Sequence, residues 1–167
     1  MQLNQQHSWI GDLFFKYYTY LGDGLFTIIL ALALFAFGKR KLPALLILTF
    51  LFSGLLVQAI KSIEQRPRPG LYFEKTAFVH SVDGVLHKGK NSFPSGHTTT
   101  AFATAALLAL ATQQKRLQLL YLFAALLAGY SRIYLGQHFL DDVVAGMCLG
   151  TLSAILLAYL FRNRELD

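Results

Sequence analysis

The residues with the clearest chemical potential form a pair near the end of the sequence. His138 and Asp142 stand four residues apart at the start of a predicted helix, so their side chains should lie on one face and in contact. A carboxylate that holds one ring N–H of an imidazole leaves the other nitrogen unprotonated and nucleophilic. Because histidine can form covalent intermediates, this spacing predicts a nucleophile at His138 that Asp142 orients.

Positively charged residues stand at or just beyond the C-terminal ends of two other predicted helices, without a matching number of carboxylates nearby. Lys61, Arg68 and Arg132 supply three positive charges; the guanidinium fork suits phosphate oxygens and lysine adds a point charge. Ser95 and Gly96 open a predicted helix, where free backbone N–H groups favour an anion. Gly96 allows close approach of the backbone and the Ser95 hydroxyl can donate. Together these residues predict a phosphate-binding site.

A second histidine follows this helix start directly. His97 is placed to protonate a departing alcohol and later to deprotonate water. The carboxylates other than Asp142 are scattered and show no metal-ligand spacing. We therefore expect neither a metal ion nor another cofactor, because the fixed cations can stabilise the charge that a metal would otherwise stabilise.

These chemical residues are separated by long apolar segments that must position them. The chain has 167 residues, of which 54% are hydrophobic and only 14% charged, whereas soluble domains carry about 25% charged residues. A membrane-spanning helix needs about 20 mostly apolar residues. Five segments meet or approach this requirement: Leu21–Gly38, Leu42–Ile60, Ser95–Thr112, Leu117–Leu135 and Phe139–Phe161. The sequence predicts a single all-α domain over residues 1–167, a polytopic transmembrane helical bundle.

The connections between these segments predict an orientation. The basic stretches Lys39–Lys41, Gln113–Arg116 and Arg162–Arg164 fall on one side if the five helices alternate, which the positive-inside rule assigns to the cytoplasm. The long loop Lys61–Pro94 and His138 fall on the other side. This loop is expected either to pack on the bundle or to dip into the membrane interface. We expect a bacterial inner-membrane protein whose site opens at the outer face, and no cleavable signal peptide.

Three motifs in this arrangement resemble those of the type 2 phosphatidic acid phosphatase (PAP2) family, which is related to bacterial acid phosphatases and vanadium haloperoxidases. Lys61, Arg68 and Pro69 match Lys-x6-Arg-Pro, and residues 94–97 read Pro-Ser-Gly-His. Ser-Arg-x5-His-x3-Asp is matched by Ser131, Arg132, His138 and Asp142. The resemblance covers about residues 21–161 and implies a PAP2/haloperoxidase-like helical core.

The resemblance implies a role for each matched residue. His138 would form a phosphohistidine, Asp142 would orient it and His97 would act as general acid, without a metal. Five residues would bind the phosphoryl oxygens: Lys61, Arg68, Ser95, Gly96 and Arg132. Members of the membrane branch usually have six spanning helices, and this sequence shows no counterpart of the first: either it is a shortened member or the start of the chain is missing. The segment His7–Tyr20 is amphipathic instead and is expected to lie along the membrane interface.

The implied function is hydrolysis of a lipid phosphate or pyrophosphate. Undecaprenyl pyrophosphate, phosphatidylglycerol phosphate, phosphatidate and lipid A 1-phosphate remain open as substrates. A lipid phosphotransferase would use the same nucleophile; a catalytically silent lipid-binding protein and a haloperoxidase are the remaining alternatives. Membrane lipids are the expected surroundings, and no obligate protein partner is predicted. The net charge of +6 does not indicate nucleic-acid binding, because the charges form no basic face.

Other polar residues have simpler interpretations. Arg66 is expected to be a surface charge or to lie behind the site, and Asp141 to cap a helix. Cys148 lies in an apolar run and is expected to be buried. The histidines His7, His80 and His87 are expected to be ordinary polar residues. The lysines Lys75, Lys88 and Lys90 are expected to form a solvated loop face or, alternatively, to meet an acidic lipid headgroup. The role of Glu64 stays open, with pairing to a motif cation as one alternative.

Overall fold

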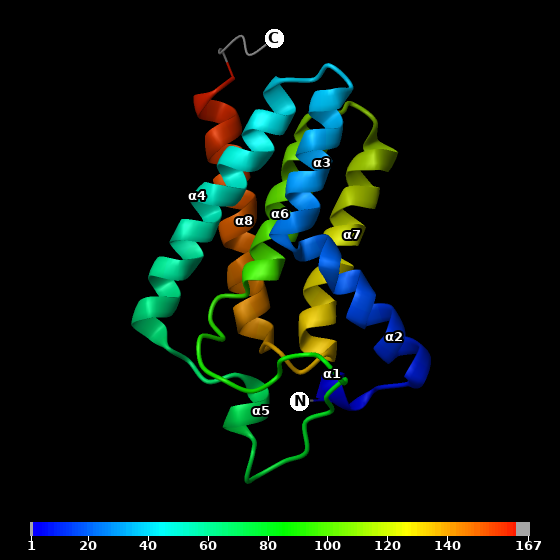
Figure 1. Ribbon diagram of the computed structural model, residues 1–167, viewed down its shortest axis with the longest axis vertical. Helices are drawn as coiled ribbons and strands as arrows, with labels where there is room; N and C mark the ends of the chain where they lie inside the picture. Colours follow the sequence, from blue (N-terminus) through cyan, green and yellow to red (C-terminus); the bar gives the residue numbers. More distant parts are fainter. Residues whose placement is uncertain (1, 163–167) are drawn as a thin grey trace.

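The computed structural model describes residues 2–162 and contains only helices within that range (Figure 1). Two long helices precede the long loop region and three follow it. In chain order the elements are α1 (Gln2–Gln5), α2 (Trp9–Tyr18), the 3-10 turn η1 (Thr19–Gly22), α3 (Gly24–Ala36), α4 (Lys41–Glu64), α5 (Pro69–Tyr72), α6 (Gly96–Leu110), α7 (Lys115–Tyr134) and α8 (Leu140–Leu160). The predicted all-helical bundle is confirmed, and all five predicted apolar segments form helices.

Helix α6 occupies the centre of the bundle and packs against α4, α7 and α8. Small residues on α8 allow this close packing, because a Cβ at Gly150 would lie 2.2 Å from the carbonyl oxygen of Thr99. A Cβ at Gly146 would lie 2.7 Å from the carbonyl oxygen of Ser95. Glycines at such contacts let two helix backbones approach closely. The first turn of α6 is therefore held against α8 between Gly146 and Gly150.

The bundle has the lengths and the surface of a membrane protein. Helices α4, α7 and α8 are long and apolar enough to span a membrane, and the pair α2–α3, bent by 58°, is a fourth candidate. Outward-facing side chains such as Leu32 and Leu152 are 63% and 65% exposed. The third predicted span, Ser95–Thr112, forms α6, which has only 15 residues, roughly 22 Å of helix against about 30 Å of hydrocarbon. This central helix is thus shorter than the helices around it.

The bend between α2 and α3 brings the N-terminal region onto the polar end of the bundle. Asp23 caps α3 by accepting a hydrogen bond from the Leu25 N–H, 2.9 Å away. Next to it, a Cβ at Gly22 would lie 2.6 Å from the carbonyl oxygen of His97. The bend is therefore seated against the first turn of α6, and α2 leaves the bundle at an angle (Figure 1).

The loop between α4 and α6 folds back on the bundle, as the sequence predicted. The backbone N–H of Arg68 donates to the carbonyl of Gly89 at 2.8 Å, and that of Ser92 donates to Arg66 at 2.9 Å. Gln137 binds the Leu86 carbonyl through its side-chain amide, at 2.8 Å. These contacts fix the loop over the end of the bundle where α6 and α8 begin.

One detail differs from the sequence predictions and a second stays a prediction. Cys148 is exposed on α8, so the prediction that it is buried was wrong; in a membrane helix the outward face is as apolar as the inward face, and apolar neighbours do not indicate burial. The predicted interfacial segment His7–Tyr20 forms α2, with Trp9 78% exposed. Its position at the interface stays a prediction.

Candidate active site

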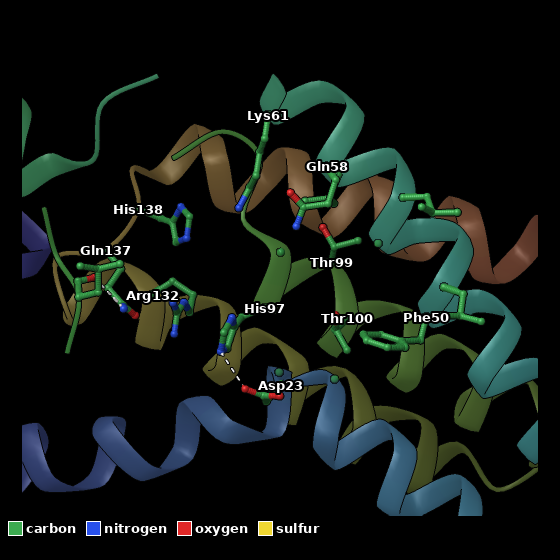
Figure 2. A pocket seen from close by; sticks show the side chains of 18 of the residues that line it. Asp23, Phe50, Gln58, Lys61, His97, Thr99, Thr100, Arg132, Gln137 and His138 are labelled. Carbon is green, nitrogen blue, oxygen red and sulfur yellow. Dashed lines mark hydrogen bonds and ion pairs between the residues drawn. The ribbon is translucent and has the colours of Figure 1, made fainter. Parts of the chain in front are cut away.

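Residues of all three sequence motifs meet in one pocket of about 630 Å³ at the end of the bundle that carries the long loop (Figure 2). Its charged and histidine side chains come from the bend between η1 and α3, from α4, the following loop, α6, α7 and the α7–α8 connection. Six of the eight predicted site residues line it: Lys61, Arg68, Gly96, His97, Arg132 and His138. The two others, Ser95 and Asp142, are buried behind it.

The predicted histidine–carboxylate pair is formed. The Nδ1 atom of His138 lies 3.5 Å from Oδ2 of Asp142, and both side chains are almost fully buried. The same Oδ2 accepts a hydrogen bond from the backbone N–H of Phe139 at 2.8 Å, which fixes the carboxylate at the start of α8. With Nδ1 turned toward Asp142, Nε2 is the ring nitrogen available for reaction.

Burial also determines the charge of this imidazole. Burial lowers the pKa of His138 below the usual value for histidine, and the pairing of its Nδ1–H with Asp142, which accepts, opposes this effect only in part. Removing a charged group from water disfavours its charged form. His138 is therefore neutral at neutral pH, as a nucleophile must be.

A serine that the sequence analysis missed completes the surroundings of Asp142. Ser92 is fully buried, and its hydroxyl donates to Oδ2 of Asp142 at 2.5 Å. The same hydroxyl lies 3.4 Å from Nδ1 of His138, so it touches both members of the pair. In the sequence, only its position two residues before Pro94, the first residue of the Pro-Ser-Gly-His motif, indicated that Ser92 lies near the site.

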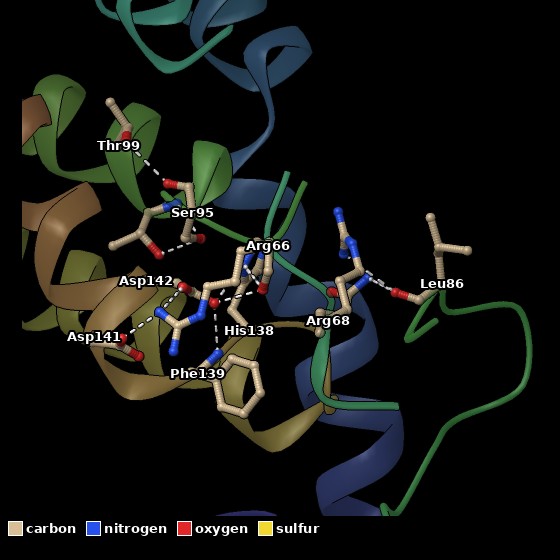
Figure 3. Close-up of polar contacts among 12 residues, drawn as sticks. Arg66, Arg68, Leu86, Ser95, Thr99, His138, Phe139, Asp141 and Asp142 are labelled. Atoms are coloured by element: carbon tan, nitrogen blue, oxygen red, sulfur yellow. Dashed lines mark hydrogen bonds and ion pairs between the residues drawn. The ribbon is translucent and has the colours of Figure 1, made fainter. Parts of the chain in front are cut away.

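Arg66 lies behind the site, one of the two positions that the sequence analysis allowed for it, and contacts the orienting carboxylate directly. Its Nη1 atom lies 3.2 Å from Oδ1 of Asp142 and also pairs with Asp141 (Figure 3). The guanidinium carbon lies 4.9 Å above the ring centroid of Phe139. The prediction that Asp141 caps α8 was wrong: Phe139 occupies the N-cap, and Asp142 binds its backbone N–H.

Ser95 lies at the N-cap of α6, behind the pocket. Its hydroxyl oxygen accepts hydrogen bonds from the N–H of Thr98 at 3.4 Å and from the Thr98 hydroxyl at 2.9 Å. Its backbone N–H donates to the carbonyl of Asp142 at 2.9 Å. Ser95 thus ties α6 to α8, while a direct contact with phosphate stays a prediction.

The cations retain unused donors. Arg132 is 3% exposed and donates from Nη1 to the hydroxyl of Thr19 in η1. The Nη1 atom of Arg68 lies 3.5 Å from the carbonyl of Leu86. The Nε atoms of both arginines are buried and have no acceptor among the described residues. Because an unsatisfied buried donor is costly, these guanidinium groups are suited to an anionic ligand.

His97 has a carboxylate neighbour that the sequence did not indicate. Its Nε2 atom lies 3.7 Å from Oδ2 of Asp23, and both side chains line the pocket (Figure 2). Asp23 is 74 positions away in the chain, so only the bend between η1 and α3 brings the two residues together. Among residues 2–162, no group of three or more histidine, cysteine or acidic side chains could hold a metal ion.

Comparisons with known proteins agree with this arrangement. The family model described as the PAP2 superfamily matches residues 42–166. The chain is 34% identical over 118 residues to the lipid A 1-phosphatase of Rhizobium johnstonii, covering 71% of this chain and 47% of the relative. It is 31% identical over 147 residues to phosphatidylglycerophosphatase B of Bacillus subtilis, covering 80% and 67%.

A solved structure extends the likeness to nearly the whole chain. The crystal structure of Aquifex aeolicus LpxE superposes with a TM-score of 0.84 at 30% identity, covering 95% of this chain and 91% of that one. Among the curated relatives, by contrast, the chain spans about half the length of the lipid A 1-phosphatase.

Proposed function

This chain belongs to the PAP2 superfamily, and from that premise we propose that it is an integral-membrane phosphatase acting on a phosphomonoester or pyrophosphate of a lipid. The single observation that carries the proposal is the pocket itself. It holds a buried neutral histidine, His138, beside the three cations Lys61, Arg68 and Arg132, and His97 from α6 also lines it. Cations that surround a nucleophile stabilise the charge of a transferring phosphoryl group.

In the first step, Nε2 of His138 attacks phosphorus and forms a P–N bond. The bond between phosphorus and the lipid oxygen breaks, and that oxygen takes a proton from His97 and leaves as the lipid alcohol, or as the lipid phosphate if the substrate is a pyrophosphate. Asp142 accepts the Nδ1–H of His138 and stabilises the positive charge that develops on the ring. Lys61, Arg68 and Arg132, with the backbone N–H of Gly96, hold the phosphoryl oxygens.

In the second step, water attacks phosphorus of the phosphohistidine. Neutral His97 accepts a proton from this water, the P–N bond breaks, and inorganic phosphate leaves. His138 and the protonated His97 are thereby restored for the next cycle. A lipid hydroxyl in place of water would give phosphotransfer, so release of phosphate without an added acceptor distinguishes the two reactions.

The remaining walls of the pocket support a lipid substrate. Apolar residues of α4, Phe50, Leu51, Leu55 and Val57, continue the pocket away from the polar end. The hydrocarbon part of a lipid can lie along them while its phosphate reaches His138. The two relatives described above are named for lipid A 1-phosphate and phosphatidylglycerophosphate, and both classes of lipid are candidates here.

The distribution of basic residues supports an orientation. The α3–α4 and α6–α7 connections lie at the end of the bundle opposite the pocket (Figure 1), and they carry Lys39, Arg40, Lys41, Lys115 and Arg116. By the positive-inside rule this end faces the cytoplasm. The pocket then opens at the outer face of a bacterial inner membrane.

The experiment is phosphate release by the purified protein in detergent micelles, without an added acceptor. The panel is undecaprenyl pyrophosphate, phosphatidylglycerol phosphate, phosphatidate and lipid A 1-phosphate. We expect hydrolysis of at least one lipid, loss of activity in His138→Ala and no effect of EDTA. His87→Ala, a histidine outside this pocket, is the matched control. Activity that survives His138→Ala and is lost with EDTA would contradict the mechanism, and an inactive parent would contradict the function.

A further inference from the structure

Asp23 is the one carboxylate among the described residues that line the pocket. A negative charge beside a phosphate-binding site repels the ligand unless a cation neutralises it. Asp23 precedes residues 42–166, which match the family model, so none of the three motifs assigns it a role. Its position therefore needs a separate explanation.

Each of the two carboxylate oxygens of Asp23 has its own neighbour. Oδ1 accepts the hydrogen bond from the Leu25 N–H at 2.9 Å, and Oδ2 is the oxygen 3.7 Å from Nε2 of His97. Gly22 fixes the chain on the other side, since its α-carbon has no room for a Cβ against the His97 carbonyl. One carboxylate oxygen thus holds the helix start and the other faces the histidine.

The charges around His97 explain what this carboxylate can do. Burial of the His97 ring disfavours a positive charge on it, and so do the cations Arg132 from α7, Lys61 from α4 and Arg68 from the loop. His138 from the α7–α8 connection lies near it too, in its neutral form. A general acid must nevertheless hold a proton before it can donate one. Asp23 is the one opposite charge placed to compensate.

We propose that Asp23 is a positioning residue for the general acid: it pairs with protonated His97 and orients the ring toward the leaving oxygen. Nε2–H of the imidazolium faces Asp23, and Nδ1–H passes to the leaving oxygen as the P–O bond breaks. Neutral His97 keeps its Nε2–H toward Asp23, and Nδ1 accepts the proton of water in the second step. The inference rests on the proposed phosphatase function and adds a second aspartate–histidine pair to the first.

The test compares leaving groups in the variant Asp23→Asn. Asparagine caps a helix about as well as aspartate, so the fold and the α3 start are retained. Two substrates are compared: the panel lipid that the parent hydrolyses fastest, whose alkoxide needs a proton, and 4-nitrophenyl phosphate, whose phenolate leaves without one. We expect kcat for the lipid to fall by roughly 10²-fold, within the range for general acid catalysis, and the nitrophenyl rate to stay near the parent's.

Two further readouts separate this role from a structural one. The basic limb of the lipid pH–rate profile should move to lower pH in Asp23→Asn, because protonated His97 loses its counter-charge. KM should not rise, because a negative charge has left an anion-binding pocket. In a His97→Ala background, Asp23→Asn should add little, since both residues act in one step.

The outcomes distinguish this inference from the function on which it rests. Equal losses on both substrates, an unmoved basic limb, or full additivity with His97→Ala would overturn the role of Asp23. In each of these cases lipid hydrolysis by the parent would leave the phosphatase function standing. A parent that hydrolyses no lipid in the panel would overturn both.

Discussion

At the scale of the residue, the nucleophile depends on how firmly Asp142 is held. Its carboxylate contacts the Ser92 hydroxyl, the Arg66 guanidinium and the Phe139 N–H as well as His138. These contacts come from both ends of the α4–α6 loop, from the α7–α8 connection and from the start of α8, so segments far apart in the chain converge on one carboxylate (Figure 3). Orientation of the imidazole therefore depends on the loop as much as on the helices.

Replacing Asp142 by asparagine tests the orienting role. The amide oxygen can still accept from Phe139, but the amide cannot stabilise a positive imidazole, so kcat should fall by about 10³-fold or more. Inhibition by inorganic phosphate should persist, because Lys61, Arg68 and Arg132 are unchanged. The measurement is steady-state kinetics with phosphate as competing ligand, and an Asp142→Asn variant as active as the parent would refute the role.

Replacing Ser92 by alanine tests the loop contribution. The loss of a hydrogen bond to the carboxylate should lower kcat roughly tenfold, equivalent to about 1.4 kcal/mol, with little change in KM. Ser92→Thr keeps the hydroxyl and should restore most of the rate. Ser62→Ala, which removes an exposed serine hydroxyl on α4, is the control. A Ser92→Ala variant that folds and turns over normally would show that the hydroxyl is dispensable.

At the scale of the element, the site depends on close contact between α6 and α8. Ser95 begins α6 and its N–H binds the Asp142 carbonyl, so any separation of the two helices also displaces the catalytic pair. Gly146 and Gly150 keep that contact short. The two helix starts therefore act as one rigid unit.

Replacing Gly150 by leucine should force α8 away from Thr99, where even a Cβ would lie 2.2 Å from the carbonyl oxygen. We expect thermal stability in detergent to drop, by an amount on the order of 1–3 kcal/mol, and activity to fall with it. Gly54→Ala on α4 is the control, since a Cβ there has no neighbour within 4 Å. Equal stability of the two variants would contradict the close-packing account.

The helices and the motif residues could be predicted from sequence because both signals are local. Apolar runs such as Leu42–Ile60 located α4 to within a few residues, and short fixed spacings identified His138 and Asp142. Asp23, Ser92 and Arg66 could not be found in this way. Each reaches the site through a bend or a loop whose path depends on tertiary packing, and none shares a helical period with the residue it contacts.

At the scale of the whole molecule, the two ends of the bundle differ in chemistry. The long loop lies at one end, and the basic α3–α4 and α6–α7 connections lie at the other (Figure 1). The pocket, lined by Lys61, Arg68 and His138, belongs to the end with the loop. Outward-facing leucines cover the sides between them. The bundle thus brings a phosphate site close to the surface of a membrane while its cations remain among polar residues.

This asymmetry predicts the orientation in a cell. The test uses single-cysteine variants in a Cys148→Ser background, expressed in bacteria whose outer membrane is permeabilised and whose inner membrane is intact. In these cells Lys88→Cys, in the loop, should react with a maleimide that cannot cross the inner membrane. A cysteine at Arg40 should react only after lysis, because the positive-inside rule places it in the cytoplasm. Labelling of the Arg40 position in intact cells would mean that the protein is inserted the other way round.

The most direct test of the central claim is to trap the phosphoenzyme. Purified protein is mixed with a panel lipid carrying a ³²P label at its terminal phosphate, quenched in alkali within one turnover, digested and analysed for labelled peptides. Phosphohistidine survives alkali, and we predict label on the peptide that contains His138, with none in His138→Ala. Turnover without label on that peptide, or label retained in His138→Ala, would contradict the assignment of His138 as the nucleophile.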